Sequence, residues 1–518
     1  PMRGSLVLLA LVLSYCLLVA ADYDTKKECS SCQNFVNDIY QGIPENTTDT
    51  EIINVFEDVC DKVFKDSAKC AKDAELFKNL VVGGNAGTYR KYTPFDVCLA
   101  FGYCDSKCCL SPSLPEQIHL QQVDESTMII HWITLDELAS ECMYGTSENV
   151  LSSQINGTRY TSSKGSWVGY FHRCVLTDLK PGVKYYYKVG DKQHHSLWHP
   201  AISIPVTWFE ILPAGIEEVA QKPFQVAFVA DMGATDASDD TVQSIYAGMS
   251  TGDIRAVIHH GDISYADGVA YLWDTFLRKV EGVASRITYW TTPGNHEGFF
   301  DFVPYALRFD YPAYLQSPKL PVQLWKSVNA GGVHFVLLNS EGPLSSIGDL
   351  SPLSPQYAWL NADLAAVNRS LTPWIVVVSH RPFYCSASRK SDCVDNAAIL
   401  REYCEDLFHK YHVDLVISGH VHSYERTFPV YQGNVTNGAD RSAYDNPSAP
   451  VYLLNGSAGC KEQLMNGWVT PAPTWSANHN GEHFGWSRLS VSATSLTWDF
   501  VAAEDATNIL DTFTLSRS

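Results

Sequence analysis

Residues 224–233 read FQVAFVADMG, a run of β-forming residues that ends in a carboxylate and a glycine. The same construction occurs four more times, as AVIHHGDISY (256–265), ITYWTTPGNHE (287–297), WIVVVSH (374–380) and LVISGHVH (415–422). Each run of strand formers leads into a polar residue of a metal-binding type. In layered α/β sheets, ligands bind at the carboxyl ends of strands, so we expect the five ends to meet in one crevice.

The polar residues at these strand ends form one chemical set. They are Asp231, Asp262, Tyr265, Asn295, His380, His420 and His422. Hard oxygen and borderline nitrogen donors without a thiolate suit iron, zinc or manganese rather than calcium. Seven donors exceed one tetrahedral site and favour two metal ions that share a carboxylate, an arrangement that clamps a phosphoryl group and activates water. A lone histidine in such a strand is more often a packed core residue, but donors at five successive strand ends indicate a metal centre.

The five blocks resemble the signature of calcineurin-like metallophosphoesterases. Tyr265, three residues after Asp262, narrows the resemblance to purple acid phosphatases, and it extends over about residues 115–515. The resemblance implies a layered αββα catalytic domain, with a C-terminal extension, over residues 222–518. It also implies an acid phosphatase that hydrolyses phosphate monoesters at a binuclear metal centre.

The resemblance also implies a role for each residue. Fe(III) would be held by Asp231, Tyr265 and His422, and a divalent ion (Zn, Fe or Mn) by Asn295, His380 and His420, with Asp262 bridging the two. His296 would be the catalytic residue that contacts substrate and protonates the leaving group, while metal-bound hydroxide is the nucleophile. A trivalent ion strongly acidifies bound water, so hydroxide persists below pH 7. His259 and His260 match no ligand position and are expected to be structural.

One loop departs from the plant members of this family. After the position of His380, plant members carry a histidine pair that faces the substrate, whereas this chain has Arg389 and Lys390 and is closer to animal-type members. These two side chains either touch phosphate or belong to a solvated loop. We expect Cys385, Cys393, Cys404 and Cys460 of the catalytic module (residues 222–518) to pair among themselves, with Cys142 and Cys174 in the β module (residues 112–210). The pairing is left open for Cys108, Cys109, Cys142, Cys174, Cys385, Cys393, Cys404 and Cys460.

The composition indicates the secretory pathway. The 518 residues include 15 cysteines, more than a cytosolic chain usually carries. Residues 1–21 have a basic start, an apolar run and small residues at the end, which predicts a signal peptide, with an uncleaved anchor as the alternative. We expect a protein that is secreted or resides in the lysosome or vacuole lumen. Five glycosylation sequons fit this route, at Asn46, Asn156, Asn368, Asn434 and Asn455.

Residues 22–110 show helical periodicity, and six of their cysteines belong to this pattern, at Cys29, Cys32, Cys60, Cys70, Cys98 and Cys104. Six cysteines allow 15 connectivities, and the spacing alone does not choose among them. The segment resembles a saposin B-type domain, a small all-α module, and the resemblance implies the nested pairs Cys29–Cys104, Cys32–Cys98 and Cys60–Cys70. Saposin-like domains bind lipid or present it to an enzyme, so a lipid or membrane surface is one expected partner. The alternative is a disulfide-bonded cap that only shields the enzyme.

Residues 112–210 change to a period of two, as at Met128, Ile130 and Trp132. Short strands divided by turn signals predict an all-β sandwich. The run from Leu179 to Tyr187 resembles the fibronectin-like N-terminal domain of larger purple acid phosphatases. Since this segment carries no catalytic cluster, we expect a scaffold packed on the enzyme domain.

Charge and architecture limit the competing functions. A net charge of −20 argues against nucleic acid as a partner, so affinity for small phosphoesters must come from metals. A lipid phosphodiesterase is the runner-up, because a saposin domain before a metallophosphoesterase is similar to the architecture of acid sphingomyelinase. That family uses histidine where Gly233 stands and lacks the Tyr265 ligand. A third alternative, a lipid-binding protein with an inactive enzyme domain, conflicts with seven intact ligands.

Overall fold

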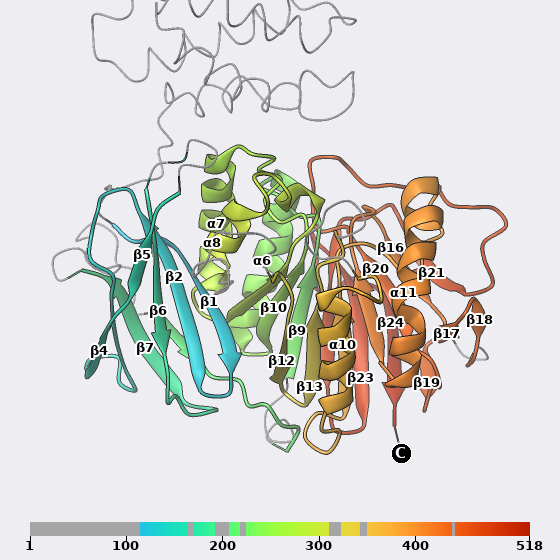
Figure 1. Cartoon of the computed structure of the whole chain (residues 1–518), viewed down its shortest axis with the longest axis horizontal. Coiled ribbons are helices and arrows are strands. Elements are labelled where there is room, and N and C mark those ends of the chain that lie inside the picture. The colour runs from blue at the N-terminus through green and yellow to red at the C-terminus, as the bar shows by residue number, and fades with distance from the viewer. Residues whose placement is uncertain are drawn as a thin grey trace, which may run out of the picture. The chain divides into compact units, whose positions relative to one another are not determined.

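The computed structural model describes residues 114–162, 167, 169–191, 207–217, 224–309, 323–341, 350–437 and 441–517 (Figure 1). The predicted signal peptide, the saposin-like segment with its six cysteines, Asn46, Cys108 and Cys109 lie outside these residues. The chain divides into two compact units, and nearly all described residues belong to the second unit. Within the described residues, no helix is long and apolar enough to cross a membrane.

The largest sheet among the described residues has eleven strands. In spatial order these are β19 (Ala443–Asp445), β24 (Ile509–Ser516), β23 (Ser495–Ala502), β22 (Gly485–Val491), β9 (Phe224–Val229), β10 (Ile254–His260), β11 (Thr288–Thr292), β1 (Glu116–Asp124), β2 (Thr127–Thr134), β6 (Tyr170–Leu176) and β5 (Thr158–Tyr160). Strands β9, β10 and β11 pair in parallel, so their carboxyl ends lie at the same edge. The residues of β10 and β11 are all buried, which explains why their sequences lack a clean polar alternation.

A second sheet of seven described strands supplies the other strand ends. Its spatial order is β12 (Lys326–Ala330), β13 (Val333–Leu337), β14 (Trp374–Val378), β15 (Leu415–Ser418), β20 (Val451–Asn455), β16 (Tyr424–Thr427) and β21 (Ser476–Asn480). Strands β13, β14, β15 and β20 are parallel neighbours. A two-stranded ribbon, β17 (Val430–Tyr431) with β18 (Asn434–Val435), follows β16.

The main core lies between the two large sheets. Phe228, Ile258 and Trp290 from the eleven-stranded sheet and Phe335 and Val376 from the seven-stranded sheet belong to one cluster of fully buried side chains. The rings of Phe228 and Phe335 meet with centroids 6.4 Å apart. Each such side chain stabilises the fold by about 1.5–3 kcal/mol through burial. This shared core holds the two sets of strand ends at a fixed separation.

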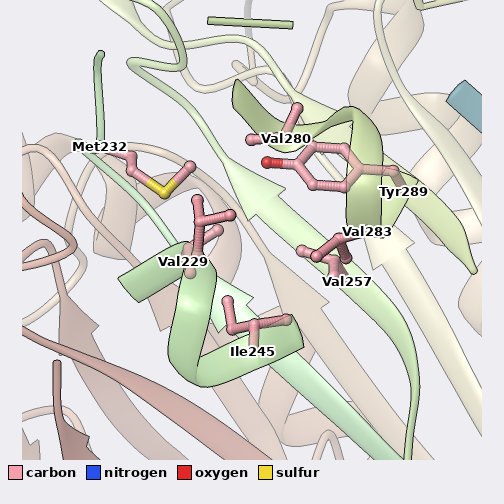
Figure 2. A pocket seen from close by; sticks show the side chains of 8 residues that line it. Val229, Met232, Ile245, Val257, Val280, Val283 and Tyr289 are labelled. Atoms are coloured by element: carbon pink, nitrogen blue, oxygen red, sulfur yellow. The ribbon is translucent and has the colours of Figure 1, made fainter. Parts of the chain in front are cut away.

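Helices cover the outer faces of both sheets. The described helices are α6 (Asp236–Thr251), η3 (Asn295–Glu297), α7 (Ala270–Ala284), α8 (Val303–Arg308), α10 (Pro355–Ala366), η5 (Lys390–Asn396) and α11 (Ala397–Lys410). Leu360 of α10 and Leu400 of α11 pack on Val377 of β14. On the other sheet, Ile245 of α6 and Val283 of α7 face β9 and β10 across a small apolar cavity (Figure 2). The resulting order of layers is helix, sheet, sheet and helix, as the sequence predicts for the catalytic module.

The β module continues the large sheet and adds a smaller one. Its four-stranded sheet has the order β4 (Ser153–Asn156), β3 (Glu141–Gly145), β7 (Lys184–Gly190) and β8 (Thr207–Glu210). Trp132 of β2 and Tyr187 of β7 share one buried cluster, so this small sheet packs on β1, β2 and β6. The predicted scaffold is therefore joined to the catalytic strands, because β1 pairs in parallel with β11 at Leu120 and Thr288.

The structure resolves part of the open cysteine pairing. Disulfides join Cys142 to Cys174 and Cys385 to Cys393. Cys404 and Cys460 are free and buried, so the expectation that they also form a disulfide is wrong. Cys404 lies on α11 within an apolar cluster, and Cys460 lies beside His422, with its Sγ 3.1 Å from Nδ1. Each thiol is thus enclosed by a different set of neighbours.

Candidate metal centre

The seven predicted ligands come together at the carboxyl ends of strands from both large sheets. Asp231 follows β9, Asp262 and Tyr265 follow β10, and Asn295 lies in η3 after β11. The three histidines follow β14 and β15 of the other sheet. The chain thus places ligands from both sheets opposite one another.

Distances divide the ligands into two groups. In the first, Nε2 of His380 lies 3.2 Å from Oδ2 of Asp262 and 3.2 Å from Oδ1 of Asn295. One donor atom each of Asp262, His380 and His420 lies within 4.8 Å of the others, a spacing that fits a shared cation. These side chains are the ones that the family resemblance assigns to the divalent ion.

The second group contains the tyrosine. The hydroxyl of Tyr265 lies 3.0 Å from Nε2 of His422 and 3.4 Å from Oδ1 of Asp231. Nε2 of His422 is 3.5 Å from the same carboxylate oxygen. All three side chains are buried, so phenol, carboxylate and imidazole converge where water has little access.

The electrostatics of the crevice favour cations. Burial alone would lower the pKa of His380, but the Asp262 carboxylate overcomes it and raises that pKa to about 10. Burial likewise opposes the protonation of His422, and its hydrogen bonds and the Asp231 charge raise its pKa to about 11. Burial, together with Asp231 and Asp262, raises the pKa of Tyr265 well above its ordinary value of 10. A tyrosinate therefore needs a multivalent cation beside it, and the donor set fits such an ion.

Several ligands occupy a backbone region that side chains rarely adopt. Asp231, Asp262, Tyr265 and His420 all have φ between 50° and 71°. Left-handed conformations of residues with a Cβ atom are unfavourable by roughly 1–2 kcal/mol each and persist where the surrounding fold enforces them. Four such residues close together at the strand ends indicate a functional site, and no pattern in the sequence predicts their left-handed conformations.

Two glycines let the backbone pass close to the ligands. A Cβ atom on Gly261, which has φ of +92°, would lie 2.2 Å from Nδ1 of His380. A Cβ atom on Gly294 would lie 2.2 Å from Oδ1 of Asp262. Glycine is required at both positions because the chain approaches the ligands too closely for any side chain.

Glu297 is a site residue that the sequence reasoning left without a role. Its carboxylate accepts backbone N–H groups from Asp262 at 2.8 Å, Ile263 at 2.9 Å and Gly294 at 2.8 Å. It thereby ties the loop after β10 to the loop after β11. A glutamate three residues after a helix cap is a recognisable signal, and it could have identified this clamp.

The contacts of His259 and His260 agree with the structural role expected for them. Nδ1 of His259 lies 2.8 Å from the hydroxyl of Tyr289, and Nε2 of His260 lies 3.3 Å from Nδ2 of Asn455. Burial lowers the pKa of both rings to about 3, so they are neutral.

His296 stands beside the ligands and is partly exposed to solvent. Its side chain is 14% exposed, and its ring centroid lies 4.4 Å from that of Tyr265. Nε2 is 3.8 Å from Oδ2 of Asp262 and 3.9 Å from Oε1 of Glu462. An imidazole at this place can reach a molecule bound to the centre from the solvent side.

The loop that departs from plant members is closed by the Cys385–Cys393 disulfide. Within it the Arg389 side chain is 37% exposed, and its Nε pairs with Oδ2 of Asp392 at 3.1 Å. Lys390 begins η5. Arg389 is thus engaged with a neighbouring carboxylate as well as with solvent.

The sequons differ in accessibility. Asn156, Asn368 and Asn434 are exposed, as glycan attachment requires. Asn455 is only 1% exposed, and its Nδ2 donates to the carbonyl of Phe228 at 3.2 Å inside the core. The prediction of a glycan at Asn455 is therefore wrong, because an oligosaccharide cannot be accommodated there.

Family comparisons match most of the chain. Residues 115–208 match the family described as purple acid phosphatase, N-terminal domain, and residues 224–424 match calcineurin-like phosphoesterase. Residues 449–512 match iron/zinc purple acid phosphatase-like protein C. Residues 27–64 match saposin-like type B, region 1. These matches confirm the resemblances drawn from the strand-end motifs and the N-terminal cysteines.

Individual proteins agree with these families. Acid phosphatase type 7 of Mus musculus is 33% identical over 395 residues, which cover 73% of this chain and 85% of the relative. The Fe(3+)-Zn(2+) purple acid phosphatase 12 of Arabidopsis thaliana is 31% identical and covers 73% of this chain and 82% of its own. Among solved structures, purple acid phosphatase PPD1 of yellow lupin has a TM-score of 0.66 at 24% identity, covering 79% of this chain and 75% of its own. The last likeness concerns the fold alone.

Proposed function

The chain belongs to the purple acid phosphatase family, and from this membership we propose how it works as a metal-dependent acid phosphatase on phosphate monoesters. The observation that carries the proposal is the convergence of two buried carboxylates, a buried phenol, an amide and three histidines at the strand ends. The fold is that of a calcineurin-like metallophosphoesterase. The alternative of a lipid phosphodiesterase is not favoured by any comparison.

We assign the ligands as the resemblance implies. Asp231, Tyr265 and His422 would hold Fe(III), and Asn295, His380 and His420 would hold a divalent ion, with Asp262 as a ligand shared by the two. The close contacts of Tyr265 with His422 and of His380 with Asp262 support this division. The name of the Arabidopsis relative favours zinc as the divalent ion, with iron or manganese as alternatives.

When bound, the two ions supply Lewis acidity and lower the pKa of bound water, so a nucleophile is available in acid. The chain itself supplies orientation and a proton. Asp231 and Asp262 supply negative charge to the site, and Glu297 ties the loop of Asp262 to the loop that carries Asn295. His296, on the solvent side, protonates the leaving-group oxygen of the ester as it departs. Small phosphoesters are the proposed substrates because the relatives that match most of this chain are acid phosphatases.

The remaining segments serve location and delivery. We propose that residues 1–21 direct the chain to the secretory pathway and that the protein acts outside the cell or in a lysosome or vacuole lumen. Asn46, Asn156, Asn368 and Asn434 are its glycan sites. Residues 22–110 form a saposin-type helical module with the pairs Cys29–Cys104, Cys32–Cys98 and Cys60–Cys70, which brings a lipid surface to the enzyme. Residues 112–210 form a fibronectin-like scaffold.

The test combines metal content with colour. The purified protein should contain iron and a second metal, hydrolyse nitrophenyl phosphate in acid, and show a visible band from tyrosinate-to-iron charge transfer. Tyr265→Phe should remove that band. Tyr289→Phe is the matched control, since Tyr289 is equally buried but hydrogen-bonds to His259, and it should stay coloured. A coloured Tyr265→Phe protein, or a wild-type protein that binds no metal, would refute the assignment.

A further inference from the structure

The three histidine ligands differ in what holds the ring nitrogen that faces away from the metal. Nδ1 of His380 donates to the carbonyl of His260 at 3.1 Å, and Nδ1 of His422 donates to the carbonyl of Gln463 at 3.2 Å. Both carbonyls are neutral acceptors, the Cys460 thiol also lies 3.1 Å from Nδ1 of His422, and both rings leave Nε2 for a metal ion. His420 is different, because its Nε2 lies 3.1 Å from Oδ1 of the Asp392 carboxylate.

The contacts of His420 decide which nitrogen it offers. Its Nε2 also lies 3.0 Å from Nη1 of Arg381, and one ring nitrogen cannot donate to a carboxylate and accept from a guanidinium at once. Because both neighbours face Nε2, Nδ1 is the ring nitrogen that remains available to a metal ion. The proton then resides on Nε2, and Asp392 is its acceptor. Arg381 keeps its own partner, because its Nε and Nη2 lie 3.1 and 3.0 Å from Oε2 of Glu341.

Asp392 is itself firmly held. Its side chain is 8% exposed, and Nε of Arg389 lies 3.1 Å from its second oxygen, Oδ2. The next residue, Cys393, is bonded to Cys385, so a disulfide fixes the backbone beside the carboxylate. Its first oxygen, Oδ1, also lies 3.4 Å from Nη1 of Arg381. The carboxylate is therefore held between two guanidinium groups and confined to one place.

We propose that Asp392 is the positioning residue of the divalent metal site, which accepts the Nε2 proton of His420 and thereby aims Nδ1 of that ring at the ion. The inference rests on the proposed function, since it takes His420 to be a metal ligand. A carboxylate behind a histidine fixes the tautomer and makes the ring a stronger ligand, and loss of such a partner typically weakens metal affinity by about 10–100-fold. Because Asp392 contacts His420 and neither of the other two histidines, its effect is confined to the divalent site.

The experiment measures metal affinity and does not depend on turnover. Wild-type protein, Asp392→Asn and Asp395→Asn are purified with their iron, depleted of the divalent ion and titrated with Zn²⁺ by calorimetry, with bound iron and zinc determined by elemental analysis. Asp395 is the matched control, because it lies on the same turn of η5 but is exposed. Asp392→Asn should bind Zn²⁺ about 10–100-fold more weakly with unchanged iron content and visible band, and Asp395→Asn should match wild type.

Three outcomes are informative in different ways. Wild-type zinc affinity in Asp392→Asn overturns the inference while leaving the phosphatase assignment intact. Loss of iron and colour together with zinc also overturns it, because a general loosening of the fold would then be the cause. A wild-type protein that takes up neither metal refutes the proposed function itself. Asp392→Glu supplies a further check, since restoring the charge should recover part of the zinc affinity.

Discussion

Replacement of Gly261 by alanine isolates the role of close backbone approach at the metal centre. Gly261 has φ of +92°, and an added Cβ would meet Nδ1, Cγ and Cβ of His380 at 2.2, 2.5 and 2.7 Å. Gly252 is the matched control. It caps α6 at φ of +84°, and an added Cβ there meets nothing within 4 Å. The two substitutions therefore share the conformational penalty and differ in the collision.

The expected magnitudes follow from these contacts. A left-handed alanine is unfavourable by roughly 1–2 kcal/mol, which is the whole effect at Gly252. At Gly261 the His380 ring must also move by about 1 Å to reach van der Waals distance, and its hydrogen bond to the His260 carbonyl is lost. An unsatisfied buried group adds about 1–3 kcal/mol. Since a shift of about 1 Å in a catalytic group can reduce turnover roughly 100-fold, kcat/KM should fall by about that factor.

The assay pairs thermal unfolding with nitrophenyl phosphate hydrolysis for both variants. Gly252→Ala should lose some stability and keep wild-type kcat/KM, while Gly261→Ala should lose more stability and about 100-fold in kcat/KM. Equal activity of the two variants would refute the reasoning, because it would show that the His380 position does not depend on the bare backbone at residue 261.

Two further predictions concern pH and the N-terminal segment. Burial raises the pKa of Glu281 from its ordinary value of 4.5 to about 7, while the side chain accepts the backbone N–H of Gln117. The protonated side chain therefore contributes its full stabilisation of the fold below about pH 4.5, and this contribution is lost as the pH rises through about 7. That shift corresponds to about 3 kcal/mol, so Glu281→Gln should show a smaller fall in melting temperature between pH 5 and pH 8 than wild type, and parallel curves would contradict this. Deletion of residues 22–110 should spare hydrolysis of soluble nitrophenyl phosphate but abolish any activation by anionic lipid vesicles. An inactive, misfolded product would instead indicate a structural cap.

The sequence predicted the elements whose signals are local. Runs of β-formers that end in Asp231, Asp262 and His380 have a period and a terminus that can be recognised without a partner strand. Contacts between distant segments could not be predicted, because they depend on which segments become neighbours when the chain folds. Glu297 and Asp392 act on groups brought near by folding: the position of Glu297 after a helix cap is a local signal, but its contact with the Asp262 loop is not, and Asp392 carries no pattern of its own. Asn455 has a sequon, but its burial depends on β20 lying inside the seven-stranded sheet.

The pairing of the cysteines also could not be predicted from the sequence alone. The secretory route suggested that the cysteines of the catalytic module all pair, but a thiol needs a partner at the right distance as well as an oxidising compartment. Cys404 is enclosed by α11 and its apolar neighbours, and Cys460 by the loop next to His422. Only the folded arrangement reveals that these two cannot meet.

The parallel pairing of β1 with β11 has a consequence for how the chain can be divided. The junction is short, with Leu120 opposite Thr288, and it is reinforced by the Trp290 indole N–H, which donates to the carbonyl of Gln122 at 2.8 Å. A fragment that begins at β9 would leave the outer edge of β11 with unpaired N–H and C=O groups. Such an edge is a template for association with other chains. The β module therefore covers an edge of the catalytic sheet that would otherwise be exposed. We expect the two segments to occur together in one chain, to require expression together and to unfold in one transition.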